Sequence, residues 1–264
     1  MKEYRFLVAT DMDYTLLLPG EPVSAENKRA VKAVQDAGGC VTLATGRTFY
    51  LTGSYAADLH IEVPLITSNG AAISDPILFK DLESVDFPDL ILETLIALFN
   101  KENVDATGYS SDGLYFFKNS SRRGFIADYN ASVPDDIKAV ELSDLNHSFN
   151  KFLLIKPSES VISAIKSIPG LQVVSSAKNF YDVMMDGTSK GLALKKIAKS
   201  LGVKMTFALG DSENDLSLLR AADHSIAMKD SSIEQFADYI APRCEDDGFA
   251  KAVYDFILPF FEHK

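Results

Sequence analysis

The chain has 264 residues, of which 47% are hydrophobic and 24% are charged, as in an ordinary globular protein of one large domain or two modest ones. Its formal net charge of −11 argues against nucleic acid as a partner, because DNA and RNA bind basic surfaces that release counterions. No stretch approaches the ~18 apolar residues of a membrane span, and the first residues do not resemble a secretory signal. We therefore expect a cytoplasmic protein without a membrane partner; its oligomeric state has no sequence signature.

Two carboxylates follow the first predicted strand. A run of apolar and β-branched residues from Phe6 to Thr10 ends in Asp11 and Asp13. Side chains alternate faces along an extended segment, so these two acids project to the same side. Two like charges held so close need a cation nearby, or one of them must keep its proton. An isolated Asp-x-Asp pair is more often a solvated strand end, so the downstream sequence has to decide.

A βαβ unit follows. Ser24 caps a predicted helix that ends at Gly38-Gly39, and the strand from Cys40 to Ala44 runs into Thr45-Gly46-Arg47. Because such units are parallel, Thr45 is expected near Asp11. We expect a helix over residues 47–59, a short strand at 64–67 and a turn at Asn69-Gly70.

The order of predicted helices and strands changes between residues 82 and 186. Its pattern predicts an α+β unit, with helices near 90–99, 121–130 and 158–167 and strands near 104–109, 114–117, 152–155, 171–175 and 180–185. We expect residues 82–186 to form an inserted domain, and residues 1–81 with 187–264 to form the core.

The alternation of strand and helix resumes after residue 187. A helix at 189–201 carries Lys190 in its first turn, and the buried strand 205–209 ends in Gly210-Asp211-Ser212-Glu213-Asn214-Asp215. Helices at 213–222, 231–237 and 248–261 and strands at 224–228 and 239–241 complete the pattern. The predicted fold class is α/β, with a Rossmann-like, mostly parallel sheet core and an inserted α+β cap domain.

Polar groups that suit phosphate chemistry thus follow three strands. In an open parallel sheet these strand ends share one edge, where ligands bind. Asp11 and Asp211, with a backbone carbonyl and water, would form the oxygen shell that Mg²⁺ prefers. Thr45 and the Gly46 amide, at the expected start of a helix, can hold a phosphate oxygen, and Lys190 can supply a fixed positive charge.

These motifs resemble those of the haloacid dehalogenase superfamily, and within it the Cof-type sugar-phosphate phosphatases with a large α+β cap. The matching segments, in chain order, are Asp11-Met12-Asp13-Tyr14-Thr15-Leu16, Thr45-Gly46-Arg47, Lys190-Gly191 and Gly210-Asp211-Ser212-Glu213-Asn214-Asp215. The long interval between the second and third motifs is where such proteins carry the cap. The four motifs together are far more specific than any one alone.

The resemblance implies a role for each residue. Asp11 would attack phosphorus and form an aspartyl-phosphate, and Asp13 would protonate the leaving oxygen and then activate water. Phosphoryl oxygens would be held by Met12 (through its amide), Thr45, Gly46, Lys190 and Asn214. Mg²⁺ would be bound by Asp11, the Asp13 carbonyl and Asp211. Asp215 would orient Lys190 or the metal shell, and Arg47 would either touch phosphate or pair with a surface acid.

One residue departs from the family pattern. Tyr14 stands where the family usually has glycine, whose backbone tolerates angles that tyrosine resists. Either the turn has a negative φ here, or the ring leans into the mouth of the site and restricts the substrate. Candidates for substrate selection in the cap are Tyr109, Asp112, Lys118, Arg122 and Arg123.

The expected function is Mg²⁺-dependent hydrolysis of a small phosphorylated metabolite, with sugar phosphates as the expected substrates. A phosphosugar mutase would share the first motif, and product analysis separates the two. A catalytically silent phosphate-binding regulator is a third hypothesis, which the intact Asp11, Asp13, Lys190 and Asp211 disfavour. An oxidoreductase is weaker, because no GxGxxG or P-loop motif follows a strand. Cys40 and Cys244 carry no functional signal.

Overall fold

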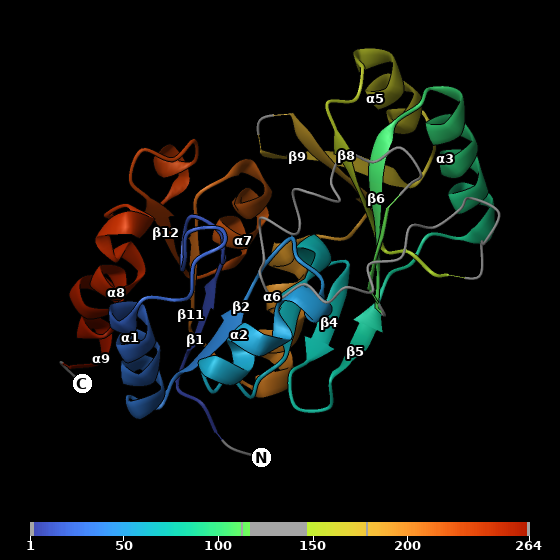
Figure 1. The fold of residues 1–264 in the computed structure, drawn as a ribbon. Helices are drawn as coiled ribbons and strands as arrows, with labels where there is room; N and C mark the ends of the chain where they lie inside the picture. Colours follow the sequence, from blue (N-terminus) through green and yellow to red (C-terminus); the bar gives the residue numbers. More distant parts are fainter. Residues whose placement is uncertain (1–2, 112, 117–146, 178, 263–264) are drawn as a thin grey trace.

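The computed structural model describes residues 3–111, 113–116, 147–177 and 179–262. The predicted helix at 121–130 and the candidate residues Asp112, Lys118, Arg122 and Arg123 lie outside these ranges. Among the described residues, no helix is long and apolar enough to cross a membrane. The chain builds a lower body around a parallel sheet and an upper body around an antiparallel one (Figure 1).

The described part of the parallel sheet has the strand order β13-β12-β11-β1-β2. Its strands are β1 (Leu7–Thr10), β2 (Cys40–Leu43), β11 (Thr206–Gly210), β12 (His224–Met228) and β13 (Tyr239–Ala241). β1 lies between β2 and β11, with Leu7 in register with Cys40 and Thr206. Both faces of β1 are buried, which explains its unbroken apolar run. The predicted Rossmann-like parallel core is confirmed.

Helices cover both faces of this sheet. α1 (Ala25–Asp36) and α8 (Gly248–Ala252) lie on one side, and α6 (Lys190–Leu201) lies on the other (Figure 1). The Ser24 hydroxyl accepts from the Asn27 amide and caps α1, as predicted. The Ser189 hydroxyl caps α6 in the same way, and Gly202 ends α6 in a left-handed conformation. The last predicted helix continues through a π-helical turn, Val253–Ile257, into α9 (Pro259–Glu262).

Three predicted helices are shorter in the structure. The helix expected at 47–59 is a 3₁₀ turn, Phe49–Leu51, followed by α2 (Gly53–Asp58). Gly53 and the β-branched Thr52, whose hydroxyl donates to the Thr48 carbonyl, account for the break. The helix expected at 213–222 divides into a 3₁₀ turn, Glu213–Asp215, and α7 (Leu216–Ala221); that at 231–237 is only a 3₁₀ turn, Glu234–Phe236.

A small antiparallel sheet leads from the core toward the upper body. Its described strands are β3 (Leu65–Thr67), β4 (Ala72–Asp75) and β5 (Lys80–Ser84), in that order. A parallel bridge between Ala44 and Ile66 joins it to the end of β2. The turn between β3 and β4 is therefore brought close to Thr45: the Asn69 amide donates to the Thr45 carbonyl at 3.0 Å.

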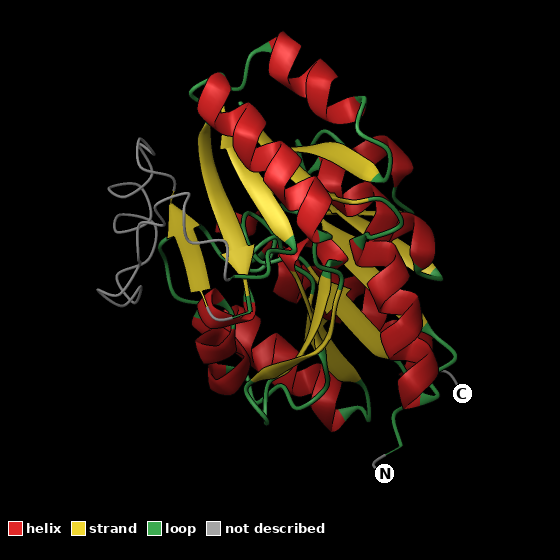
Figure 2. Cartoon of the chain, turned by 90° about the vertical axis from the view of Figure 1, so that its right-hand side faces the viewer, coloured by secondary structure: helices red, strands yellow, loops and turns green. Residues whose placement is uncertain are grey.

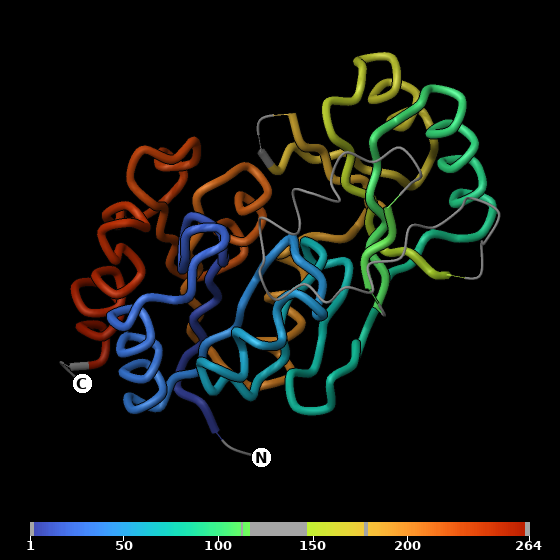
Figure 3. The backbone as a smooth tube through the Cα atoms, viewed as in Figure 1, coloured from blue at the N-terminus to red at the C-terminus, as the bar shows by residue number. Residues whose placement is uncertain are grey.

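The upper body is an antiparallel sheet with helices on one face (Figure 2). Its described strands are β6 (Asp105–Ser110), β7 (Gly113–Phe116), β8 (Lys151–Ile155), β9 (Leu171–Ala177) and β10 (Phe180–Met185), in the order β7-β6-β8-β10-β9. α3 (Asp89–Lys101) and α5 (Glu159–Lys166) pack on it through an apolar cluster that includes Phe99, Phe152 and Ile165. The tube in Figure 3 shows both connections of this body to the core, and both termini on the core.

Candidate active site

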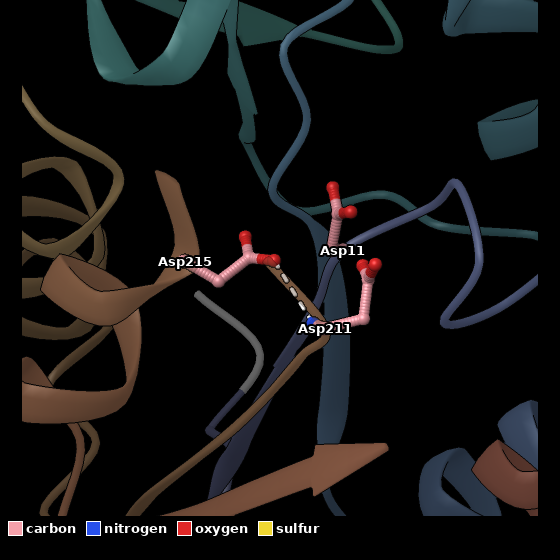
Figure 4. A group of neighbouring side chains, drawn as sticks. All are labelled: Asp11, Asp211 and Asp215. Atoms are coloured by element: carbon pink, nitrogen blue, oxygen red, sulfur yellow. Dashed lines mark hydrogen bonds between the residues drawn. The ribbon is translucent and has the colours of Figure 1, made fainter. Parts of the chain in front are cut away.

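The predicted motifs meet at the carboxyl edge of the parallel sheet. Asp11 follows β1, Thr45 follows β2 after one residue, and Asp211 follows β11. Figure 4 shows the Asp11 and Asp211 carboxylates side by side, with Asp215 entering from the turn that precedes α7. Because β1 pairs with both β2 and β11, parallel pairing alone brings the three strand ends together. The convergence expected from the sequence is present.

Three carboxylates form a compact acidic cluster. Asp11, Asp211 and Asp215 each offer one oxygen, and these oxygens lie within 4.8 Å of one another. Burial, with the Asp215 charge as the next cause, raises the pKa of Asp11 well above its usual value. The same two causes raise the pKa of Asp211 to about 7. Such crowding is relieved by a cation, and a set of hard oxygen donors matches Mg²⁺. The cluster therefore fits a divalent ion.

Lys190 neutralises part of this charge. Its side chain is fully buried, and Nζ donates to Asp11 Oδ1 at 2.8 Å and to Asp215 Oδ1 at 2.6 Å. Burial works against the ammonium, but the Asp11 and Asp215 carboxylates outweigh it and raise the pKa of Lys190 above its usual value. The other Asp215 oxygen accepts from the amides of Asp211 and Ser212. Asp215 thus orients Lys190 and the loop that carries Asp211.

Asp13 is held by Arg47. Nε and Nη2 of the guanidinium donate to the two Asp13 oxygens at 2.9 and 2.6 Å, which is a bidentate pair. Arg47 is 5% exposed, so this pair is not at the surface. Of the two sequence-based alternatives for Arg47, the structure shows pairing with an acid, in a buried rather than a surface setting. The guanidinium fixes the direction in which the Asp13 carboxyl faces.

The segments around Thr45 and Asn214 lie on either side of Asn69. The Thr45 hydroxyl accepts from the Arg47 amide at 3.1 Å, and Asn214 Nδ2 donates to Asn69 Oδ1 at 3.2 Å. No α-helix begins at Gly46, and the first turn after it is the three-residue 3₁₀ segment. The expected helix-dipole contribution at Gly46 was therefore wrong, and anion binding there would rest on local N–H and O–H groups.

Tyr14 adopts the conformation that glycine favours. Its φ is +60°, so the alternative of a negative φ was wrong. The turn is closed by hydrogen bonds from the Tyr14 amide to the Leu17 carbonyl and from the amides of Leu16 and Leu17 to the Met12 carbonyl. The Tyr14 side chain is 56% exposed beside Asp13.

Sequence reasoning left three residues near this edge without a role. Asn69 was noted only as part of a turn, yet it contacts Asn214, and the Thr15 hydroxyl donates to Asp211 Oδ1 at 3.2 Å. Lys151, from β8 of the upper body, donates to the Gly46 carbonyl at 2.6 Å. The sequence did offer a signal for Lys151, because this charged residue directly precedes the apolar run Phe152 to Ile155.

A haloacid dehalogenase-like hydrolase family model matches residues 8–253. A 5-amino-6-(5-phospho-D-ribitylamino)uracil phosphatase of Bacillus subtilis is 27% identical over 263 residues, with 96% of each chain covered. A haloacid dehalogenase-like hydrolase structure from B. subtilis superposes with a TM-score of 0.82 at 24% identity, covering 97% of this chain and 100% of the other. A subclass IIB sugar phosphatase structure gives 0.85 at 22% identity, covering 96% and 99%.

The parallel sheet with helices on both faces defines the class of protein as α/β, with an additional antiparallel body. With a family model that spans nearly all of it, the chain belongs to the haloacid dehalogenase-like hydrolases. The resemblance drawn from the four motifs is confirmed.

Proposed function

We propose that this protein is a Mg²⁺-dependent phosphatase that hydrolyses a small phosphorylated metabolite, with sugar phosphates as the first class to test, through an aspartyl-phosphate. The observation that carries the proposal is Asp11 itself, a buried carboxylate at the end of β1 that Lys190 holds within an acidic cluster. The B. subtilis relative acts on a phosphorylated ribityl compound, according to its name, and the subclass IIB relative is a sugar phosphatase. Both names support a small phosphate ester as substrate. A cytoplasmic setting stays a prediction from the sequence.

The proposed metal ligands are the carboxylates of Asp11 and Asp211 and the backbone carbonyl of Asp13. Asp215 lies in the same cluster, but its oxygens already accept from Lys190 and two backbone amides, which favours an orienting role. Mg²⁺ bound there would neutralise charge that develops on the transferred phosphoryl group.

In the first step, an Asp11 oxygen forms a bond to phosphorus as the ester bond to the leaving oxygen breaks. A protonated Asp13 gives its proton to that oxygen, so the leaving group departs as an alcohol. In the present arrangement Arg47 donates to both Asp13 oxygens, so one of these hydrogen bonds has to open before Asp13 can pass a proton to the leaving oxygen, while the other keeps the carboxyl directed.

In the second step, Asp13 takes a proton from water. The water oxygen bonds to phosphorus, the bond to Asp11 breaks, and inorganic phosphate leaves. Throughout, we assign the phosphoryl oxygens to the Met12 and Gly46 amides, Thr45, Lys190 and Asn214, since transfer depends mainly on positioning and charge neutralisation.

We also propose that residues 82–186 act as a cap that selects the substrate, over a core of residues 1–81 and 187–264. The described strands of the antiparallel body lie inside this range. Tyr109 of β6, one of the candidate selectors, lies under Lys151 Nζ at 3.9 Å from its ring centre.

The test is release of inorganic phosphate from a panel of phosphorylated sugars and polyols, with Mg²⁺ and with EDTA. We expect Mg²⁺-dependent release that Asp11→Asn abolishes. Absence of release from every ester would contradict the enzyme assignment. Recovery of an isomeric phosphate ester instead of free phosphate would indicate a mutase.

A further inference from the structure

A buried ion pair of the cap reaches into the phosphate-binding edge of the core. Lys151 of β8 and Asp182 of β10 are 2% and 1% exposed, and their charged atoms lie 2.9 Å apart. They lie on neighbouring, hydrogen-bonded strands, so both belong to the same antiparallel sheet. Lys151 Nζ also donates to the Gly46 carbonyl, at 2.6 Å. The pair thus makes a direct polar contact with the segment assigned to phosphate binding.

Asp182 makes the second contact with the core. Its Oδ2 accepts from Asn69 Nδ2 at 2.7 Å, and Asn69 Oδ1 accepts from Asn214 Nδ2 at 3.2 Å. A carboxylate takes only donors, so it keeps the NH₂ group of Asn69 facing the cap and the amide oxygen facing Asn214. The Ser212 hydroxyl donates to the Asn214 side-chain oxygen at 2.5 Å. The direction of the Asn214 amide is therefore set from both ends.

Stability alone is a weak reason for such a pair. Burying an ion pair costs desolvation that its attraction roughly offsets, and apolar residues of similar size often serve as well. If the cap lifts from the core, Lys151 and Asp182 stay together, while Gly46 and Asn69 lose their partners. The contacts that depend on docking are those made with the two phosphate-binding segments.

We propose that Lys151 and Asp182 are positioning residues through which docking of the cap orders the Gly46 segment and the Asn214 amide, so that cap docking and phosphate binding favour each other. This inference rests on the proposed function, which assigns Gly46 and Asn214 to the phosphoryl group. This coupling is reciprocal: if docking of the cap raises the affinity for phosphate by some factor, bound phosphate raises the docking equilibrium by the same factor.

The test uses the full chain and orthophosphate as the probe, with binding measured by titration calorimetry in Mg²⁺. Lys151→Met combined with Asp182→Leu removes both charges, so neither charge is left buried without its partner. We expect this double variant to raise the Kd for orthophosphate about fivefold or more. Lys166→Met and Glu159→Gln, exposed on α5, are matched charge controls and should change it less than about twofold.

The relay through Asn69 is tested by adding Asn214→Ala. Asp182 and Asn214 are joined only through Asn69 in the hydrogen bonds described above, so a purely structural pair would act independently of Asn214. We expect the Kd effect of the double variant to shrink by about threefold in the Asn214→Ala background. Equal effects in both backgrounds, or an unchanged Kd in the double variant, would overturn the inference.

Phosphate release by the parent protein separates the two proposals. If the parent hydrolyses esters and the double variant binds phosphate normally, only the positioning role fails. If the parent neither binds orthophosphate nor releases it from any ester, the proposed function fails and the positioning role falls with it. A lower Tm of the double variant without a change in Kd counts against positioning, because it reports packing alone.

Discussion

Tyr14 has a strained backbone conformation and is 56% exposed. A non-glycine residue in the left-handed region costs roughly 1 kcal/mol, and the exposed side chain offers little burial to offset this. Tyr14→Gly is therefore expected to raise the free energy of unfolding by about 1 kcal/mol, measured by urea titration. Tyr14→Ala keeps the Cβ atom and the strain, so it should show no such gain. Equal stability of the two variants would contradict the strain argument.

The raised pKa of Asp211 predicts how the stability of the metal-free protein changes with pH. Its pKa is raised to about 7 in the fold, whereas an unfolded Asp titrates at about 3.9. Between these values the unfolded chain releases a proton that the folded chain keeps, so the unfolded chain binds fewer protons. The contribution of Asp211 to stability is then greatest below about pH 4 and is lost as pH rises to 7.

Asp211→Asn should accordingly gain stability relative to the parent as the pH rises. In EDTA, we expect the difference in unfolding free energy to shift in favour of the variant by more than about 1 kcal/mol between pH 5 and pH 8. The exposed Glu93→Gln is the control, with a difference that stays constant. If the difference for Asp211→Asn also stayed constant, the pKa of the Asp211 carboxyl would not be raised by folding.

In the proposed mechanism, Arg47 acts on catalysis through Asp13. Lysine keeps the charge of Arg47 but cannot form the bidentate pair, so Arg47→Lys leaves Asp13 poorly directed. We expect kcat to fall by about tenfold or more for alkyl phosphates, whose leaving oxygen needs a proton. For p-nitrophenyl phosphate, which has a good leaving group, the loss should be smaller. Equal losses for both substrates would assign Arg47 to phosphate binding instead.

Helix α6 illustrates how one close approach fixes a functional side chain. A Cβ atom on Gly191 would lie 2.0 Å from the Ser217 carbonyl oxygen of α7, so the two helices touch backbone to backbone beside Lys190. Gly191→Ala should destabilise the protein by about 1–3 kcal/mol and lower activity, because α6 and Lys190 must shift. Lys195→Ala, on the exposed side of α6, is the control. A variant as stable and active as the parent would refute this account.

At the scale of helices and strands, the sequence predicted most of the elements that position the site. β1, β2 and β11 are apolar runs buried on both faces, and parallel pairing alone brought Asp11, Thr45 and Asp211 together. The helix at 47–59 failed because local side-chain hydrogen bonding and Gly53 interrupt it. At Tyr14 the alternative of a negative φ failed, because the hydrogen bonds of the turn set the backbone angle there and residue type alone does not reveal them.

The contacts that escaped prediction are those between elements far apart in the chain. Asn69 meets Asp182, 113 positions away, and Lys151 meets Gly46, 105 positions away. Such pairs depend on how the upper body packs against the lower one, which periodicity and motif spacing do not encode. Pairing of Arg47 with an acid was one of the sequence-based alternatives, but the identity of that acid as Asp13 was not predicted, because it depends on the loops after β1 and β2.

At the scale of the molecule, an acidic protein is proposed to bind an anionic substrate. The net charge of −11 disfavours anions at long range, so affinity has to come from cations placed within the site. Lys190, Arg47 and Lys151 are all buried near the carboxyl edge of the sheet, two from the core and one from the cap. The cations available for the proposed phosphate binding are thus local and come from both bodies.

The central claim is that Asp11 becomes covalently phosphorylated. The most direct measurement is rapid quenching during turnover of a phosphorylated sugar, reduction of the protein with borohydride, and peptide mass spectrometry. An aspartyl-phosphate is reduced to homoserine, so we expect homoserine at position 11 in the parent, and none without substrate or in Asp11→Asn. Substrate turnover with residue 11 recovered only as aspartate, or reduction at another carboxylate, would contradict the account.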